Sequence, residues 1–176
     1  MQPDLIRIGK LNKTFGTRGE VLLDLDIPDT ILQTGMPVFL GIAETRVPFM
    51  ITEIFLRPDG RYQLLLDSIL SPEQAGSIVN AVAYLERKYL PAPGEGQMYL
   101  TELIGYSATD QQEGKLGIIR DILAYPEQDM LEIIDSRERI LLLPLVEAYL
   151  VEIDDREKVV SLDCPTGLIR LLRGES

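Results

Sequence analysis

The chain has 176 residues, of which 45% are apolar, and a formal net charge of −11 at pH 7. It is long enough for one well-packed domain or two small ones, and no apolar run approaches the ~20 residues that span a bilayer. Histidine is absent and cysteine occurs once, which excludes Ser-His-Asp and Cys-His nucleophiles and metal sites built on imidazole or several thiolates. We therefore expect a cytoplasmic protein without a metal or cofactor.

Short apolar runs separated by glycine, proline and aspartate recur through the first half of the chain, a pattern typical of strands. Apolar residues in 20–27 alternate with Asp24 and Asp26, which predicts a strand with one buried face. The turn sequence Arg-Pro-Asp-Gly at 57–60 joins two such runs and predicts a hairpin. Pro48 should lie at an edge or near a strand start. The predicted strands are 5–10, 20–27, 36–42, 46–56, 61–67 and 81–88.

One helix is expected among these strands. Ser71 can cap it, Pro72 suits its first position and Gln74 completes a capping box, so the helix should run to about Asn80. A stretch of prolines and glycines follows the last of these strands, as in a linker. It predicts a linker over 91–97.

Strand patterns resume beyond the linker, at 116–124, 129–134, 138–143, 150–153 and 158–162, with a terminal helical turn at 167–172. Their spacing is typical of a small barrel. We predict an all-β protein with one or two short helices, formed by two small β-barrels in tandem. The first barrel spans 1–90 and the second spans 98–176.

The negative charge is concentrated in the second half of the chain. Residues 1–94 carry −2, whereas residues 95–176 carry −9. Such a surface attracts a basic partner and repels phosphate backbones, although an acidic surface can also serve solubility alone.

The densest basic cluster is the glycine-rich connection at 9–20. Lys10, Lys13 and Arg18 surround Phe15, and cations beside an aromatic ring can hold RNA. Taken alone, a tight turn with solvated cations explains the same residues, because glycine permits positive φ.

Two other groups invite a functional interpretation. Residues 98–106, Met-Tyr-Leu-Thr-Glu-Leu-Ile-Gly-Tyr, form either an interface anchor or a first barrel strand that packs inward. A carboxylate-dependent hydrolase would need two carboxylates of different pKa in one concave site, with Asp24, Asp26, Asp154 and Asp155 as candidates. A solvated strand face explains Asp24 and Asp26 much better, and Asp154 and Asp155 are typical of a turn.

Three segments in order together resemble RimM, the family of bacterial ribosome maturation factors. They are Ile-Gly-Lys at 8–10 with Phe-Gly-Thr-Arg-Gly-Glu-Val at 15–21, then 98–105, then the C-terminal runs 142–144, 151–154 and 165–168. The resemblance implies an assembly factor of the small ribosomal subunit with a C-terminal PRC-barrel, and we expect it to be a monomer without enzymatic activity. Such a factor binds a basic ribosomal protein of the subunit head, the nineteenth of the small subunit, and assists maturation of the 16S rRNA head.

The resemblance also assigns candidate site residues. Those for the ribosomal protein are Met98, Tyr99, Glu102 and Leu103, and those for rRNA or the subunit are Lys10, Lys13, Phe15, Gly16, Arg18 and Gly19. Phe15 stands where the family usually has histidine, and Met98 stands where it usually has an aromatic residue. A PRC-barrel adaptor for another complex and the hydrolase are the alternative functions.

Overall fold

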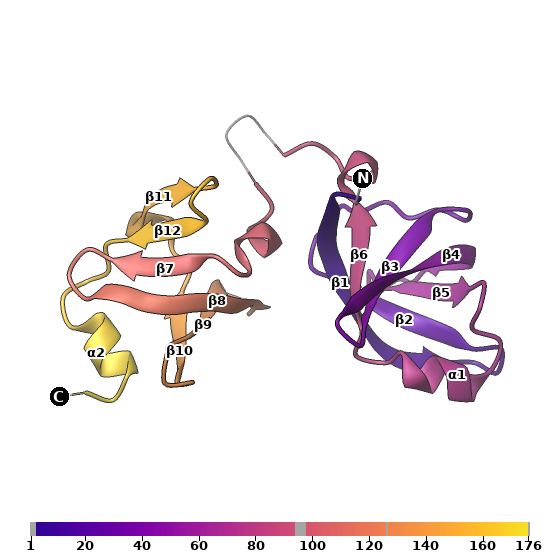
Figure 1. Ribbon diagram of the computed structural model, residues 1–176. Helices are drawn as coiled ribbons and strands as arrows, with labels where there is room; N and C mark the ends of the chain where they lie inside the picture. The colour runs from indigo at the N-terminus through magenta and orange to yellow at the C-terminus, as the bar shows by residue number, and fades with distance from the viewer. Residues whose placement is uncertain (1–2, 94–97, 126, 176) are drawn as a thin grey trace. The chain divides into compact units, whose positions relative to one another are not determined.

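The computed structural model describes residues 3–93, 98–125 and 127–175, and the chain divides into two compact units, Met1–Gln97 and Met98–Ser176 (Figure 1). The described chain is mostly strand with two short α-helices, which confirms the predicted all-β class. Residues 94–97 of the predicted linker lie outside the described part, and its extent stays a prediction. Within the described ranges, none of the helices has the length and apolarity that crossing a bilayer needs.

The first unit is a closed barrel. Its elements are β1 (Leu5–Phe15), β2 (Glu20–Leu25), β3 (Pro37–Ile42), β4 (Thr45–Leu56), β5 (Tyr62–Leu66), α1 (Pro72–Ser77), β6 (Val82–Glu86) and the 3₁₀ turn η1 (Arg87–Tyr89). The strands neighbour one another in the order β1-β2-β5-β4-β3-β6, and β1 also pairs with β6 to close the barrel (Figure 1). Ile6 and Ile8 of β1 face inward in alternation, and Leu11 faces inward after the register shift near Gly9; all three are at most 4% exposed.

Gly9 marks a close approach of two backbones in this barrel. A Cβ atom at Gly9 would lie 2.0 Å from the carbonyl oxygen of Asp24 on β2, so no other residue fits without moving a strand. The pairing of β1 with β6 shifts register between Arg7 and Gly9, and such a bulge bends and twists a strand. This bend lets one long strand pair with both of its neighbours.

Pro48 of β4 lies where a strand tolerates proline. It pairs with Phe39 of β3, whereas the pairing of β4 with β5 begins only at Ile51. The missing N–H of proline therefore falls on the side of β4 that has no β5 partner at that position.

Helix α1 begins as predicted but ends earlier. The Ser71 hydroxyl accepts the Gln74 N–H at 3.2 Å, and Pro72 occupies the first turn. The helix stops at Ser77 rather than Asn80, so the predicted end is wrong. Asn80 adopts φ +70° and donates its N–H to the Leu11 carbonyl oxygen at 2.8 Å, which draws the chain back to the barrel.

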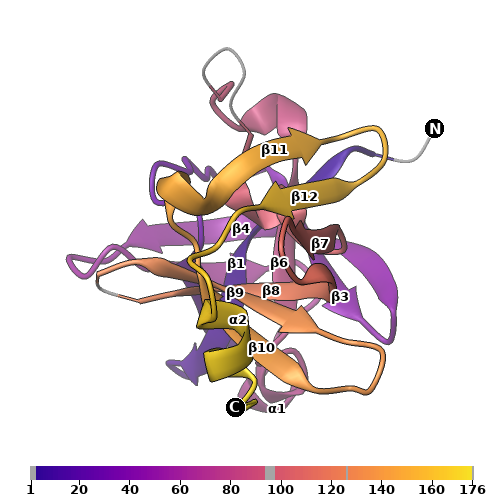
Figure 2. The same ribbon diagram turned by 90° about the vertical axis from the view of Figure 1, so that its left-hand side faces the viewer.

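The second unit is a six-stranded sheet with short helical segments. Its elements are η2 (Leu100–Leu103), β7 (Ser107–Asp110), β8 (Gly114–Ala124), β9 (Asp129–Ile134), β10 (Ile140–Pro144), η3 (Glu147–Tyr149), β11 (Leu150–Asp154), β12 (Val159–Leu162) and α2 (Leu168–Leu172). The order is β10-β9-β8-β7-β12-β11, with β7 and β12 parallel. Helix α2, predicted as a terminal turn, lies beside β10 (Figure 2).

The inward strand expected at 98–106 does not form. A 3₁₀ turn, η2, occupies this segment, and the first strand is β7, which the sequence pattern did not predict. The Glu102 carboxylate accepts the Tyr99 N–H at 2.9 Å and so stabilises the start of a helical turn. Gly105, at φ +94°, then redirects the chain into β7.

The close contact at Gly9 gives a direct test of the barrel. We expect Gly9→Ala to destabilise the protein by about 3 kcal/mol, because its methyl group must push β1 away from β2. Gly76→Ala is the matched control, since Gly76 lies in α1 with nothing within 4 Å of a Cβ atom, and alanine there should add up to about 1 kcal/mol. Urea unfolding of both variants measures the difference, and equal stabilities would contradict the packing described for Gly9.

Candidate protein and nucleic-acid interfaces

The connection between β1 and β2 is a four-residue loop closed by the cross-strand pair Phe15 and Glu20. Gly16 and Gly19 adopt φ +70° and +92°, in the left-handed region that favours glycine. A Cβ atom at Gly19 would also lie 3.0 Å from two backbone oxygens, those of Ile69 and Ser71. The turn alone therefore explains why both positions are glycine, in agreement with the tight turn that was one interpretation of the sequence.

Arg18 is bound by two carboxylates instead of projecting freely from the loop. Its terminal nitrogens each donate to one oxygen of Glu53 at 2.9 Å, and its Nε donates to Glu20 Oε1 at 3.2 Å. These bonds and the nearby negative charges, Glu53 first, raise the pKa of the guanidinium. Arg18 therefore shapes the loop, and its charge is partly balanced by two carboxylates, while its place in an RNA contact stays a prediction.

Glu20 lies beneath the loop and is 7% exposed. Its Oε2 accepts the Arg18 backbone N–H at 3.0 Å. Burial alone would raise the pKa of this carboxyl, but hydrogen bonds from its own and the Arg18 backbone N–H groups, together with the guanidinium, hold it below the ordinary value. A buried anion therefore fixes the loop conformation.

Two lysines near this loop differ from Arg18, whereas Arg57 from the β4–β5 turn is paired with Asp59 at 3.7 Å. Lys10 and Lys13 are exposed, and among the described residues neither ammonium has an ion-pair partner. Phe15 is 41% exposed, and the Arg57 guanidinium from the β4–β5 turn lies 5.0 Å from its ring centroid. Arg57 was missed in the sequence because only the barrel pairing brings it to Phe15. We call Lys10, Lys13, Phe15 and Arg57 the loop cluster.

The candidate protein-binding segment is only partly at the surface. Leu103 is 1% exposed and belongs to the core of the second unit, so the prediction that its side chain meets a partner is corrected. Met98 also packs against that core, and Tyr99 is half-buried. Leu100, which the sequence did not single out, is 41% exposed. We call Met98, Tyr99, Leu100 and Glu102 the η2 segment.

A second apolar feature lies on the outer face of the same sheet. Ile118 of β8 pairs with Ile134 of β9, which pairs with Ile140 of β10, and we call these three the isoleucine row. Ile118 and Ile140 are 40% and 50% exposed. The row was not visible in the sequence, because it depends on the register of three strands.

Exposed carboxylates without a cationic partner are numerous in the described part of this unit. They lie in the turns and on the edge strand β11, so they present negative charge to solvent. They include Glu127, Glu138, Glu147, Glu152 and Glu157.

The acids proposed for a hydrolase serve structural contacts. Asp24 accepts the Asn12 side-chain N–H at 2.6 Å, and Asp26 accepts from Arg7 at 2.7 Å. Asp154 caps a turn, and Asp155 accepts the Lys158 ammonium at 2.7 Å. The four belong to two different units, and the described residues hold no group of three or more potential metal-ligating His, Cys, Asp or Glu. This arrangement offers no support for a paired acid and base.

The fold and these surfaces define a tandem β-barrel protein, and its second unit falls in the PRC-barrel class, because the family model of the RimM PRC barrel domain matches residues 100–168. Ribosome maturation factor RimM of Flavobacterium psychrophilum is 30% identical over 169 residues, covering 96% of this chain and 97% of that protein. The chain belongs to the RimM family of ribosome maturation factors.

Other similarities extend over the same length. Ribosome maturation factor RimM of Bacteroides fragilis is 28% identical over 170 residues, covering 96% of this chain and 93% of that protein. A crystal structure from Pseudomonas aeruginosa, described as a RimM-type 16S ribosomal RNA processing protein, is 20% identical, with a TM-score of 0.40 and coverage of 94% of this chain and all of that one.

The buried Glu20 predicts a pH-dependent stability. Because its folded pKa lies below the ordinary value of 4.5, its contribution is present above about pH 4.5 and is lost as the pH falls through the folded pKa. We expect Glu20→Gln to lose about 1–2 kcal/mol at pH 7, and the gap from the unsubstituted protein to narrow in acid. Urea unfolding from pH 3 to 7 measures this gap. Glu53→Gln, the exposed partner of Arg18, should have the smaller effect; a gap independent of pH would contradict the role of Glu20.

Proposed function

We propose that this chain assists maturation of the small ribosomal subunit by using its two units for two different partners. The C-terminal unit holds a basic ribosomal protein of the subunit head, the nineteenth of the small subunit, and the N-terminal barrel contacts the head of the 16S rRNA. The observation that carries this proposal is the division of charge between the two units, −3 over Met1–Gln97 (9 Lys/Arg against 12 Asp/Glu) and −8 over Met98–Ser176 (8 against 16).

The protein-binding surface is assigned to the η2 segment. Tyr99 and Leu100 supply partly exposed apolar area, and Met98 beside them is flexible enough to adapt to a partner. The isoleucine row adds apolar area on the same unit, whose unpaired carboxylates would attract a basic protein. Apolar anchors then supply affinity, while the charges speed association and make it sensitive to salt.

The RNA-binding surface is assigned to the loop cluster. Lys10 and Lys13 are exposed cations with no ion pair to any described residue, and the Phe15 ring is partly open for stacking. Arg57, itself paired with Asp59, supports one face of that ring. Because this unit is nearly neutral overall, its contact with phosphate meets little long-range repulsion.

A PRC-barrel adaptor for another complex shares this fold and differs only in its partner. Affinity capture of the full chain from cells separates the two functions. Enrichment of immature small subunits supports the ribosomal role, and capture without ribosomal components supports the adaptor.

Tyr99 tests the protein-binding surface. We expect the full chain to bind the basic ribosomal protein with an affinity that falls as salt rises, and Tyr99→Ala to weaken binding at least about tenfold, as loss of an aromatic anchor does. Tyr125→Ala is the matched control, because Tyr125 belongs to the same unit and is 53% exposed. Calorimetry at several salt concentrations measures both; equal losses for the two variants, or no dependence on salt, would contradict the assignment.

The lysines test the RNA-binding surface. We expect the double variant Lys10→Gln/Lys13→Gln to bind a transcript of the 16S head more weakly and to lower the slope of log affinity against log salt by roughly 2. The control Lys115→Gln/Arg156→Gln removes two exposed, unpaired cations from the other unit and should leave the slope unchanged. Filter binding at graded salt measures the slopes, and a normal slope for the first variant would refute this contact.

A further inference from the structure

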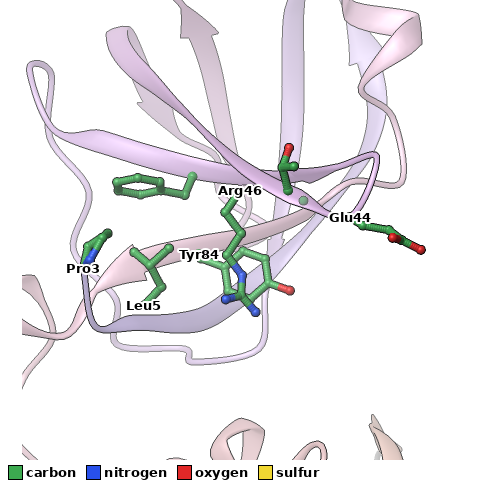
Figure 3. A pocket seen from close by; sticks show the side chains of 8 residues that line it. Pro3, Leu5, Glu44, Arg46 and Tyr84 are labelled. Atoms are coloured by element: carbon green, nitrogen blue, oxygen red, sulfur yellow. The ribbon is translucent and has the colours of Figure 1, made fainter. Parts of the chain in front are cut away.

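A hollow of about 600 Å³ lies on the outer wall of the N-terminal barrel, where β1, β3, β6 and the β3–β4 turn meet (Figure 3). Its lining includes Pro3, Leu5, Phe39, Arg46 and Tyr84. Phe39 and Tyr84 are direct cross-strand partners, so their rings come from neighbouring strands of the outer wall. No residue of the loop cluster lines this hollow.

Arg46 is the cation of the hollow. Its guanidinium carbon lies 4.3 Å from the ring centroid of Tyr84, so one face of the planar group is stacked on the ring (Figure 3). Among the described residues it has no ion-pair partner. The nearby Glu44 carboxylate points away from it in Figure 3. Arg46 therefore keeps an uncompensated charge, in contrast to Arg18.

Gly41 explains how Arg46 reaches Tyr84. Gly41 pairs with Arg46 across β3 and β4, and β3 lies between β4 and β6 in the barrel. A Cβ atom at Gly41 would already lie 3.6 Å from the Tyr84 ring, so a larger side chain would fill the space that the arginine crosses. The turn at Ala43 and Glu44, with φ +46° and +64°, holds the two strands together at this point.

We propose that this hollow binds one nucleotide of single-stranded RNA. The base would lie against the guanidinium plane and the apolar wall of Leu5 and Phe39, and a phosphate oxygen would accept hydrogen bonds from the guanidinium edge. Arginine suits both tasks, because its plane stacks on a base while its N–H groups bind phosphate. The volume falls within the range of small-ligand sites. An acidic peptide would use the charge of Arg46 but leave the flat apolar wall without a matching surface.

The hollow and the loop cluster lie toward opposite ends of β1, since Leu5 begins this strand and Phe15 ends it. At about 3.3 Å per residue Phe15 lies up to roughly 33 Å from Leu5, and Lys10 lies about midway between them. The binding of a nucleotide in the hollow rests on the proposed function, because that function makes RNA the partner of this barrel. The hollow adds a second RNA contact to that of the loop cluster. That second contact is to an unpaired nucleotide, whereas the lysines of the loop cluster supply charge.

Fluorescence anisotropy of the full chain with a labelled single-stranded RNA hexamer tests the hollow. We expect Arg46→Gln to weaken binding about tenfold and to lower the salt slope by about 0.7, the value for one phosphate of a single strand. Arg46→Lys keeps the charge but loses the plane, so affinity should fall while the slope is retained. Arg156→Gln removes an unpaired arginine from the other unit and should change neither value.

Three results would overturn this inference. The first is unchanged hexamer binding by Arg46→Gln, and the second is an unreduced hexamer affinity of Arg46→Lys. The third is displacement of the hexamer by hexaglutamate at equal concentration, which would identify an acidic peptide site. None of these results affects binding of the ribosomal protein by the η2 segment or of the 16S transcript by Lys10 and Lys13, so the proposed function is judged separately. Thermal unfolding checks that each variant is folded, as expected for exposed positions.

Discussion

A buried carboxylate beneath a turn organises each unit of this protein. In the first barrel Glu20 accepts N–H groups of the β1–β2 loop. In the second unit Asp110, 4% exposed, accepts the backbone N–H groups of Gln112, Glu113 and Cys164, each at 2.9 Å, and so ties the β7–β8 turn to the segment before α2. Burial works against the charge of Asp110, but these N–H groups hold its pKa below the ordinary value. Burial, with Asp110 adjoining, raises the pKa of the Cys164 thiol to about 12, so the single cysteine stays protonated and serves the core.

The strand pattern could be predicted from the sequence because alternation is a local property. What depends on distant residues could not. The charge of Arg18 looked free because Glu53 lies far away in the chain. The segment of η2 looked like a strand because it is rich in apolar and aromatic residues, but Glu102 stabilises a helical turn there. Leu103 lies in the segment 98–105 that resembles the family, but this segment combines surface and core residues, so its sequence did not show that Leu103 is buried. The isoleucine row needed the strand register, which no single segment contains.

The two units differ in how they treat positive charge. In the first barrel some cations are held in ion pairs that shape the structure, as Arg18 is, while Lys10, Lys13 and Arg46 have no ion-pair partner among the described residues. In the second unit the excess lies with the carboxylates. One chain thus carries two surfaces of contrasting chemistry, which suits a family whose members act in ribosome maturation, where basic proteins and anionic RNA are brought together.

The parallel pairing of β7 with β12 has a consequence for the order of folding. Ser107 pairs with Val159, so the first strand of the second unit needs its last strand, and the sheet stays incomplete until Leu162 has been synthesised. The first barrel closes when β6 pairs with β1, which requires synthesis only as far as Glu86. Contacts between distant residues are slow to form, and domains fold as units during synthesis. The first barrel can therefore be complete on the translating ribosome before the sheet of the second unit has formed.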